Sequence, residues 1–368
     1  MSTASAASSP EMEPNMTASR AFDPSDDPIF EEPVFTPEAR FIQAPGKINL
    51  HLAVGEPAEN GYHPLVTVFA AVEMWEEVIA DVTNKPGITL TMSLVAGSLV
   101  ADQYQAGAFD PADVALDETN LVYRAAAAVL AEHKLVPEDI ALHLHIAKAI
   151  PVAGGMAGGS ADAAATILLT DNHLYEAGLI DEPTPFERLD AIAASLGADV
   201  PFMLRACLDA DHPEYASIAV GTGVGEKLEP IKRHDKADLA FVLVAAPFGL
   251  STPAVFRALD EGRAQGVYPE AGDMSVPEEV LRALTGKGMN QQVRASILAP
   301  HVRNDLQEPA LNVRPELRER LSNPLALRGF ISGSGPTIAL LAPNSAAAMI
   351  LAMELREAGL FAADTTLL

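Results

Sequence analysis

Residues 151–160, PVAGGMAGGS, constrain the fold of this chain more than any other segment. Two glycine pairs, 154–155 and 158–159, follow an alternating apolar segment and precede an alanine-rich one that begins ADAAATILL. Glycine tolerates positive φ and lets the backbone approach a ligand closely. A strand, a glycine loop and a helix start form a phosphate-binding arrangement, because unpaired N–H groups and the helix dipole attract anions.

Two familiar nucleotide motifs do not fit the glycines. No Gly-Lys-Ser/Thr follows them, which excludes a Walker A loop, and their pairing around Met156-Ala157 departs from the G-x-G-x-x-G dinucleotide fingerprint. A tight turn packed under another element is the alternative interpretation. The glycines alone leave a phosphate loop and such a turn equally open.

The surrounding segments predict mixed strands and helices without strict βαβ alternation, which indicates an α+β protein in two lobes. Thr119 is the expected cap of a helix whose face carries Leu121, Ala125 and Val129. We expect extended segments at 41–54 (with a turn at Pro45-Gly46), 65–82, 140–146, 239–245 and 329–342. Further helices are expected in the alanine-rich segment after Ser160 and at 186–196, a loop at 97–118, and loop-rich or inserted segments at 209–214 and 260–296.

Residues 140–146 alternate strictly, with His143 and His145 on the side opposite Ile140, Leu142, Leu144 and Ile146. The pattern predicts a half-buried strand. Two histidines on one face suggest a metal site, but the sequence offers no third ligand. A solvated strand face is therefore the preferred interpretation.

Residues 1–39 predict a disordered acidic tail, because eight acidic residues, six prolines and a single basic residue, Arg20, cannot build a core. The whole chain carries a formal charge of −26, which argues against nucleic acid or membrane partners. The tail has no apolar run typical of a secretory signal. One cysteine, Cys207, forms no internal disulfide, so we expect a cytoplasmic protein.

Five ordered motifs resemble the GHMP small-molecule kinases over about residues 40–342. They are APGKINL (44–50), NGYHPL (60–65), PVAGGMAGGSADAA (151–164), GADVPF (197–202) and SGSGPT (332–337). The resemblance implies a ribosomal-protein-S5-like N-terminal lobe over 40–215, which binds ATP, and a ferredoxin-like α/β-plait lobe over 216–368.

Within that superfamily, the APGKINL, NGYH and GADVPF segments resemble the branch that phosphorylates the 2-hydroxyl of a cytidine diphosphate-linked methylerythritol, in the non-mevalonate isoprenoid route. The resemblance implies that Asp199 is the catalytic base and that Lys47 neutralises charge beside it. Mg²⁺ is expected with ATP, with its protein ligands unassigned. The implied ATP-binding residues are Pro151, Val152, Ala153, Gly154, Gly155, Met156, Ala157, Gly158, Gly159, Ser160 and Ala161.

The same resemblance implies an acceptor site at four further residues. Tyr62 would stack on the cytosine, His63 would contact its polar edge, Asn49 would touch substrate or orient Lys47, and Thr252 lies in a substrate-side segment. Taken alone, NGYH predicts only an Asn-Gly turn followed by two interfacial aromatics.

The glycine loop departs from the family's common GGGLGGGSSNAA at several positions. Alanines replace two glycines, at Ala153 and Ala157, and Asp162 stands in the first turn of the predicted helix. A carboxylate there suits the helix dipole but would repel a phosphate that came close. It would instead favour a metal ion.

Three alternative functions remain open at this point. One is another GHMP enzyme, such as a mevalonate or homoserine kinase or a diphosphomevalonate decarboxylase. Another is a nucleotide-binding regulator without catalysis, although both Lys47 and Asp199 are retained. A Rossmann-type oxidoreductase is the least favoured, because of the glycine spacing. The oligomeric state is not predicted.

Overall fold

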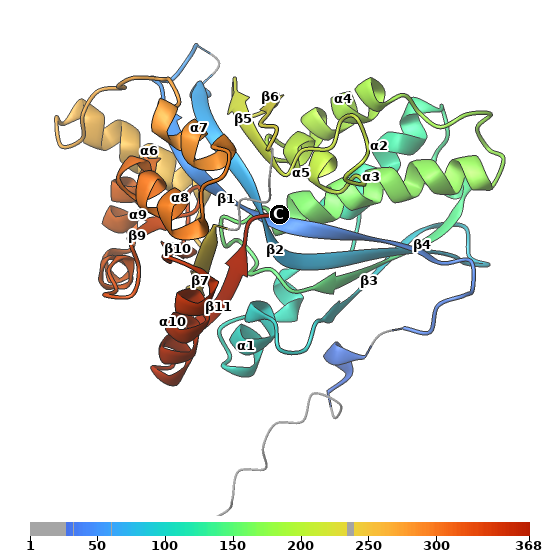
Figure 1. Cartoon of the computed structure of the whole chain (residues 1–368). Coiled ribbons are helices and arrows are strands. Elements are labelled where there is room, and N and C mark those ends of the chain that lie inside the picture. The colour runs from blue at the N-terminus through green and yellow to red at the C-terminus, as the bar shows by residue number, and fades with distance from the viewer. Residues whose placement is uncertain (1–26, 32, 60, 234–238) are drawn as a thin grey trace, which may run out of the picture.

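The computed structural model describes residues 27–31, 33–59, 61–233 and 239–368. Most of the expected tail, up to Asp26, and Asn60 of the NGYH segment lie outside the described residues. The rest forms two lobes built around two sheets, and Figure 1 shows the helices α2 to α5 gathered over the first sheet and the helices α6 to α10 around the second. The predicted two-lobed α+β fold is confirmed.

The first sheet has seven strands in the order β3-β4-β2-β1-β8, with β5 and β6 added beside β2. Its long strands pair antiparallel, and β3 runs parallel to β4. The strands are β1 (Arg40–Val54), β2 (Leu65–Val82), β3 (Gly87–Leu94), β4 (Ala141–Lys148), β5 (Ile218–Thr222), β6 (Lys227–Pro230) and β8 (Arg303–Asn304).

The Pro45-Gly46 pair makes a bulge in β1 and not the expected turn. The register on β2 shifts between these two residues, where Pro45 faces Trp75 and Gly46 faces Val72. A bulge bends a strand and turns its side chains. This one directly precedes Lys47, whose backbone N–H donates to the carbonyl of Met156 at 3.0 Å.

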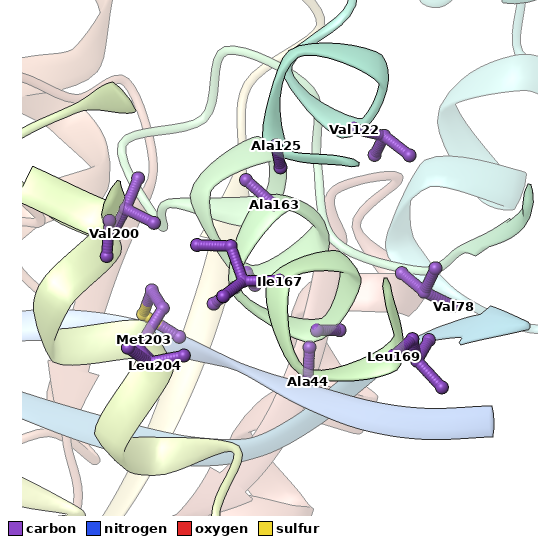
Figure 2. Packing of buried hydrophobic residues seen from close by; sticks show 14 of the residues in the cluster. Ala44, Val78, Val122, Ala125, Ala163, Ile167, Leu169, Val200, Met203 and Leu204 are labelled. Atoms are coloured by element: carbon purple, nitrogen blue, oxygen red, sulfur yellow. The ribbon is translucent and has the colours of Figure 1, made fainter. Parts of the chain in front are cut away.

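One face of the first sheet is covered by helices α2 (Leu121–Glu132), α3 (Gly158–Glu176), α4 (Phe186–Leu196) and α5 (Val200–Ala206). Figure 2 shows Ala163 and Ile167 of α3 lying between Ala125 of α2 and Val200 of α5. The small side chains of α3 let it approach β1 and β2 closely. Its N-terminus is thereby fixed at the end of the glycine loop.

The second sheet has four antiparallel strands in the order β11-β7-β10-β9. Side chains of β7 alternate between two cores: Val242 and Val244 pack with α6, α9 and α10, whereas Phe241 and Leu243 pack with Ile48 and neighbours in the first lobe. The strands are β7 (Ala240–Ala245), β9 (Arg328–Ile331), β10 (Ile338–Leu341) and β11 (Phe361–Thr366), and the helices are α6 (Thr252–Ala264), α9 (Gln307–Val313) and α10 (Ser345–Glu357).

Three sequence expectations about loops and caps are wrong. Helix α1 (Leu99–Gln105) lies within 97–118, where Ser98 caps it by accepting from the N–H of Ala101. Helices α7 (Glu278–Thr285) and α8 (Gln291–Leu298) lie within 260–296. The cap of α2 is Asn120 and not Thr119, because the Asn120 side chain accepts from the N–H of Val122.

The two histidines of β4 face the side chains of β3. His143 bonds Thr89 and Thr91, and His145 bonds Thr91 and Ser93, at 2.8–3.0 Å. His145 is only 1% exposed, so the expected solvated strand face is wrong. The ring nitrogens of both histidines are therefore engaged by the hydroxyl groups of β3.

The end of the expected tail contacts the same part of the first lobe. Thr36 donates to Asp81 of β2, and the Phe35 ring meets His145 edge-on at 5.6 Å. Tyr104 of α1 donates to Asp27 at 2.7 Å. Residues 27–31 and 33–39 therefore contact the folded chain ahead of β1.

The first sheet takes strands from beyond residue 215. Besides β5 and β6 it includes β8, at Arg303–Asn304, and Val72 of β2 bridges Leu367 near the C-terminus. The described part of the chain contains no helix long and apolar enough to cross a membrane.

Candidate active site

A cavity of about 1250 Å³ opens between the two lobes. Its lining includes residues of β1, β2 and β4, the loop before α2, the glycine loop with the start of α3, the residues before α5, and α6 with the Gly-Ser loop of 332–337. Of the sequence-predicted site residues, only the side chains of Met156 and Ala161 are outside this lining. Both are fully buried in the cores of the lobes, so they pack and do not face the cavity.

The two glycine pairs of the loop have different surroundings. At Gly155, with φ of +79°, a Cβ atom would lie 2.4 Å from the carbonyl oxygen of Ser332. The Ser332 hydroxyl also donates to the carbonyl of Gly155, at 3.0 Å. At Gly159 a Cβ would meet nothing within 4 Å, and the residue lines the cavity. The first pair therefore joins two loops, whereas Gly159 of the second pair leaves room for a ligand.

The two alanines that replace glycine in the loop adopt left-handed conformations. Ala153 has φ of 52° and Ala157 has φ of 60°. This region costs a non-glycine residue roughly 1–2 kcal/mol. Ala157 directly precedes α3, so the backbone N–H groups of Gly158, Gly159 and Ser160 in its first turn are those that a helix leaves unpaired. Although alanine replaces glycine at these two positions, the backbone keeps the left-handed conformation that places the unpaired N–H groups at the start of α3.

Lys47 and Asp199 approach each other across the cavity. Lys47 lies on β1 and is 3% exposed, and its Nζ lies 3.4 Å from Oδ2 of Asp199. Asp199 occupies the N-cap position of α5, but its side chain caps nothing. Its carboxylate is a third exposed and faces the cavity. The ion pair joins residues 152 positions apart, which sequence spacing alone cannot reveal.

A chain of hydrogen bonds fixes the orientation of Lys47. Its ammonium donates to Oδ1 of Asn49 at 2.9 Å, the Asn49 amide donates to Oγ1 of Thr67 at 2.8 Å, and the Thr67 hydroxyl donates to the carbonyl of His51 at 2.8 Å. Because the carbonyl only accepts, the direction of each donor is determined. Thr67 therefore determines the orientation of the Asn49 amide, and the amide oxygen of Asn49 holds the Lys47 ammonium in place.

Aromatic side chains line the other end of the cavity. His63 is 7% exposed, and its Nδ1 lies 2.9 Å from the carbonyl oxygen of Gly55. Its Nε2 lies 3.2 Å from Asp260 of α6, and its ring lies 5.1 Å from that of Phe256. Tyr62, 65% exposed, lines the same region. A flat heterocycle can stack on an exposed aromatic ring such as that of Tyr62.

Three residues of this region were missed in the sequence. Phe256, Arg257 and Asp260 follow Thr252 on α6 and line the cavity with it. The spacing of Phe256 and Asp260, one helical turn apart, would have suggested a shared face once a helix was assigned there. Thr252 itself hydrogen-bonds Ser334 of the Gly-Ser loop at 2.7 Å.

A buried ionic cluster, Glu76–Lys148–Asp162, lies beneath the glycine loop and was also missed. The Lys148 ammonium donates to Glu76 at 2.6 Å and to Asp162 at 2.8 Å. Burial, together with the nearby charge of Asp162, raises the pKa of Glu76 well above its usual value. Asp162 therefore pairs with a lysine, and its second oxygen has no partner among the described residues.

The cavity fits ATP and a magnesium ion in its chemistry. Backbone N–H groups at the start of α3 suit phosphate oxygens. Ser160 and Asp199 line the cavity and carry hard oxygen donors. Mg²⁺ uses one or two such donors together with substrate phosphates and water.

Similarity to known proteins extends over most of the chain. Residues 120–206 match the GHMP kinases N terminal domain. The 4-diphosphocytidyl-2-C-methyl-D-erythritol kinase of Pseudarthrobacter chlorophenolicus is 43% identical over 339 residues, which cover 89% of this chain and 94% of that one. The crystal structure of a 4-(cytidine 5'-diphospho)-2C-methyl-D-erythritol kinase superposes with a TM-score of 0.64 at 28% identity, covering 89% of this chain and 99% of the other. A mevalonate kinase, 14% identical with a TM-score of 0.54 over 89% and 99% of the two chains, shares the fold.

Proposed function

The chain belongs to the 4-diphosphocytidyl-2-C-methyl-D-erythritol kinase family of GHMP kinases, and we propose that Asp199 and Lys47 carry out the reaction of that family here. The chain is an ATP-dependent small-molecule kinase. Its reaction transfers the γ-phosphate of ATP to the 2-hydroxyl of 4-diphosphocytidyl-2-C-methyl-D-erythritol, in the non-mevalonate route to isoprenoids. The observation that carries the catalytic assignment is the 3.4 Å contact of Lys47 with Asp199 inside a cavity lined by a phosphate-type glycine loop.

Asp199 is the general base in this proposal. An alcohol is a poor nucleophile, and a carboxylate within hydrogen-bond reach removes its proton as the bond to phosphorus forms. The Asp199 carboxylate caps no helix N–H, so it is available to the acceptor. The proton passes from the acceptor hydroxyl to Asp199, and the γ-phosphoryl group passes from ATP to the acceptor oxygen, with ADP as the leaving group.

Lys47 stabilises the charge that gathers between the two substrates. Phosphoryl transfer depends mainly on positioning and on screening of phosphate oxygens. The hydrogen bonds from Lys47 to Asn49 and from Asn49 to Thr67 keep the Lys47 ammonium at the cavity wall. Backbone N–H groups at the start of α3 hold the phosphates of ATP, and a bound Mg²⁺, for which Ser160 offers an oxygen donor, would screen their charge.

The acceptor's cytosine occupies the end of the cavity lined by Tyr62, His63 and Phe256 in this proposal. Tyr62 stacks on the base, His63 contacts its edge, and Thr252 lies toward the reacting hydroxyl. We expect the reaction in the cytoplasm. There Cys207 stays reduced, and burial raises the pKa of its thiol.

The test of the base is Asp199→Asn, which keeps the shape of the side chain and removes its basicity. We expect kcat to fall roughly 10²–10⁴-fold, with unchanged thermal stability and unchanged binding of an ATP analogue. Asp209→Asn, an exposed change of the same charge outside the cavity lining, is the control. Wild-type kcat in Asp199→Asn would remove the assignment.

The test of the acceptor is competition. Cytidine diphosphate should compete with the acceptor, whereas mevalonate and homoserine should not. Tyr62→Ala should weaken cytidine binding and leave ATP binding unchanged. Binding of both substrates without turnover in the wild-type protein would favour the regulator over the kinase.

A further inference from the structure

Charged side chains of opposite sign line the cavity in equal number. The cations are Lys47, Lys148 and Arg257, and the carboxylates are Asp162, Asp199 and Asp260. In the proposed function the cavity receives two polyanions in a chain whose net charge is −26. A balanced lining supplies little attraction for them unless one of the cations is free to bind phosphate.

The two lysines are already neutralised by the protein. Lys47 contacts Asp199 at 3.4 Å and Asn49 at 2.9 Å. Lys148 contacts both Glu76 and Asp162 within 2.8 Å. The remaining cation, Arg257, is exposed to the cavity, and within the described ranges of the chain it has no hydrogen bond or ion pair.

The position of Arg257 on α6 lies between two parts of the site. Pro253, Phe256, Arg257 and Asp260 all line the cavity, and their spacing of three and four residues makes one stripe along the helix. Asp260, one turn after Phe256, is held 3.2 Å from His63. At the other end of the helix, Thr252 bonds the Gly-Ser loop.

An acceptor in the proposed orientation spans this stripe. Its cytosine lies at Tyr62, His63 and Phe256, and its reacting hydroxyl lies near Asp199. The two phosphates that join these parts must therefore pass the middle of α6. A guanidinium is always charged and binds phosphate oxygens in pairs, which makes it a strong ligand for such a bridge.

We propose that Arg257 binds the diphosphate bridge of the acceptor, a nucleoside diphosphate ester. The proposal rests on the proposed function, because it takes the position of the cytosine and of the reacting hydroxyl from it. Arg257, which has no partner in the described ranges, would bind the acceptor's phosphates, whereas Lys47 acts at the transferred phosphoryl group. Arg257 is thus a binding residue that acts on the acceptor and leaves the chemical step to Asp199.

The experiment compares cytidine with cytidine diphosphate, which differ by the group in question. Both are titrated calorimetrically into the full chain, with a non-hydrolysable ATP analogue present to fill the nucleotide site. The variants are Arg257→Gln, Arg257→Lys and the control Arg282→Gln, an exposed arginine of α7 that does not line the cavity. Arg257 is exposed, so circular dichroism and melting should match the wild type.

We expect Arg257→Gln to weaken cytidine diphosphate about 10- to 100-fold and cytidine less than twofold. Arg257→Lys should recover part of the loss, and Arg282→Gln should change neither. Added salt should weaken cytidine diphosphate less in Arg257→Gln than in the wild type, because a charge contact has been removed. In turnover, KM for the acceptor should rise while kcat and KM for ATP stay within twofold.

Three results would overturn the proposal. Equal losses for cytidine and cytidine diphosphate would mean that Arg257 acts on the nucleoside or on the fold. A loss confined to the ATP analogue would assign the arginine to the other substrate. Wild-type protein that binds neither cytidine compound would refute the proposed acceptor site itself, and the role of Arg257 with it.

Discussion

The glycine loop meets the second lobe at Gly155 and Ser332. A Cβ on Gly155 would lie 2.4 Å from the Ser332 carbonyl oxygen and 2.9 Å from that of Gly335. The Thr337 N–H also donates to the carbonyl of Gly154, at 3.1 Å. Two loops that lie about 180 residues apart in the sequence are therefore in direct backbone contact. This close approach requires a glycine, which has no side chain, at position 155.

Gly155→Ala should destabilise the protein by roughly 2–4 kcal/mol, because it adds a left-handed alanine and a steric clash with a backbone. Gly159→Ala is the matched control, since its Cβ would meet nothing within 4 Å and alanine favours helix. Urea unfolding of both variants measures the difference. Equal stability of the two would show that the loops separate without cost.

The variant Gly159→Ala should change ATP binding more than it changes stability. Gly159 lines the cavity, so an added methyl group there should raise KM for ATP while the free energy of unfolding stays near that of the wild type. A stable Gly159→Ala protein with unchanged KM would mean that this glycine pair does not lie against the nucleotide.

The Thr67 hydroxyl should act on catalysis through Asn49. Thr67→Val keeps the shape but removes the group that accepts from the Asn49 amide, so the amide loses the bond that fixes its direction. We expect kcat to fall roughly 10-fold or more because Lys47 is displaced, with Tm lowered only modestly. Thr67→Ser retains the hydroxyl and should recover most of kcat.

A simple structural role for Thr67 predicts something else. Loss of stability in Thr67→Val with a wild-type kcat, and no difference from Thr67→Ser in turnover, would contradict the relay from Thr67 to Lys47. Steady-state kinetics with both substrates varied separates kcat from the two KM values.

Protonation of His145 should destabilise the fold at acidic pH. Burial lowers the pKa of His145 to about 4, against 6.5 for a free histidine, so the native state holds it neutral. Between these values the unfolded state binds more protons, and stability falls as pH drops. From pH 7.5 to 5 this histidine should contribute a loss of about 2 kcal/mol.

The measurement is urea unfolding at both pH values for the wild type and His145→Gln. The variant should lose stability at pH 7.5, because it disturbs the bonds to Thr91 and Ser93, and should lose less further stability at pH 5. An equal decrease in both proteins would assign the acid sensitivity to other groups, such as His51, whose pKa burial also lowers to about 4.

The local parts of the fold were predictable from the sequence. Alternation placed β4, and apolar spacing placed α2 and α4, because these signals depend on neighbours within one or two turns. The short helix α1 was missed, since a loop-like run of glycine, alanine and aspartate hides the Ser98 cap. Helix α7 was also missed, because its N-cap residue is Pro277, which offers no side-chain capping signal.

The candidate site was predictable only as far as its motifs extend. Lys47 and Asp199 were paired by resemblance, and their contact follows from the packing of β1 and α5 against each other and against α3. Glu76 carries no motif and lies 72 positions from Lys148, so nothing in the sequence joins them. Arg257 likewise becomes informative only when the other cations of the cavity are seen to be paired and Arg257 has no partner among the residues that the structure describes.

The Glu76–Lys148–Asp162 cluster gives the last prediction. Lys148→Met would leave two buried carboxylates without a cation and should destabilise the protein by about 3–5 kcal/mol at pH 7. Asp162→Asn leaves one carboxylate for one lysine and should change stability by about 1 kcal/mol or less.

Because the folded state raises the pKa of Glu76 above its unfolded value, the cluster's contribution is complete at acidic pH and declines as pH rises. Removing the Asp162 charge relieves that effect, so the stability of Asp162→Asn relative to the wild type, measured by urea unfolding, should increase as the pH rises. A parallel pH dependence in the two proteins would show that Asp162 does not act on Glu76.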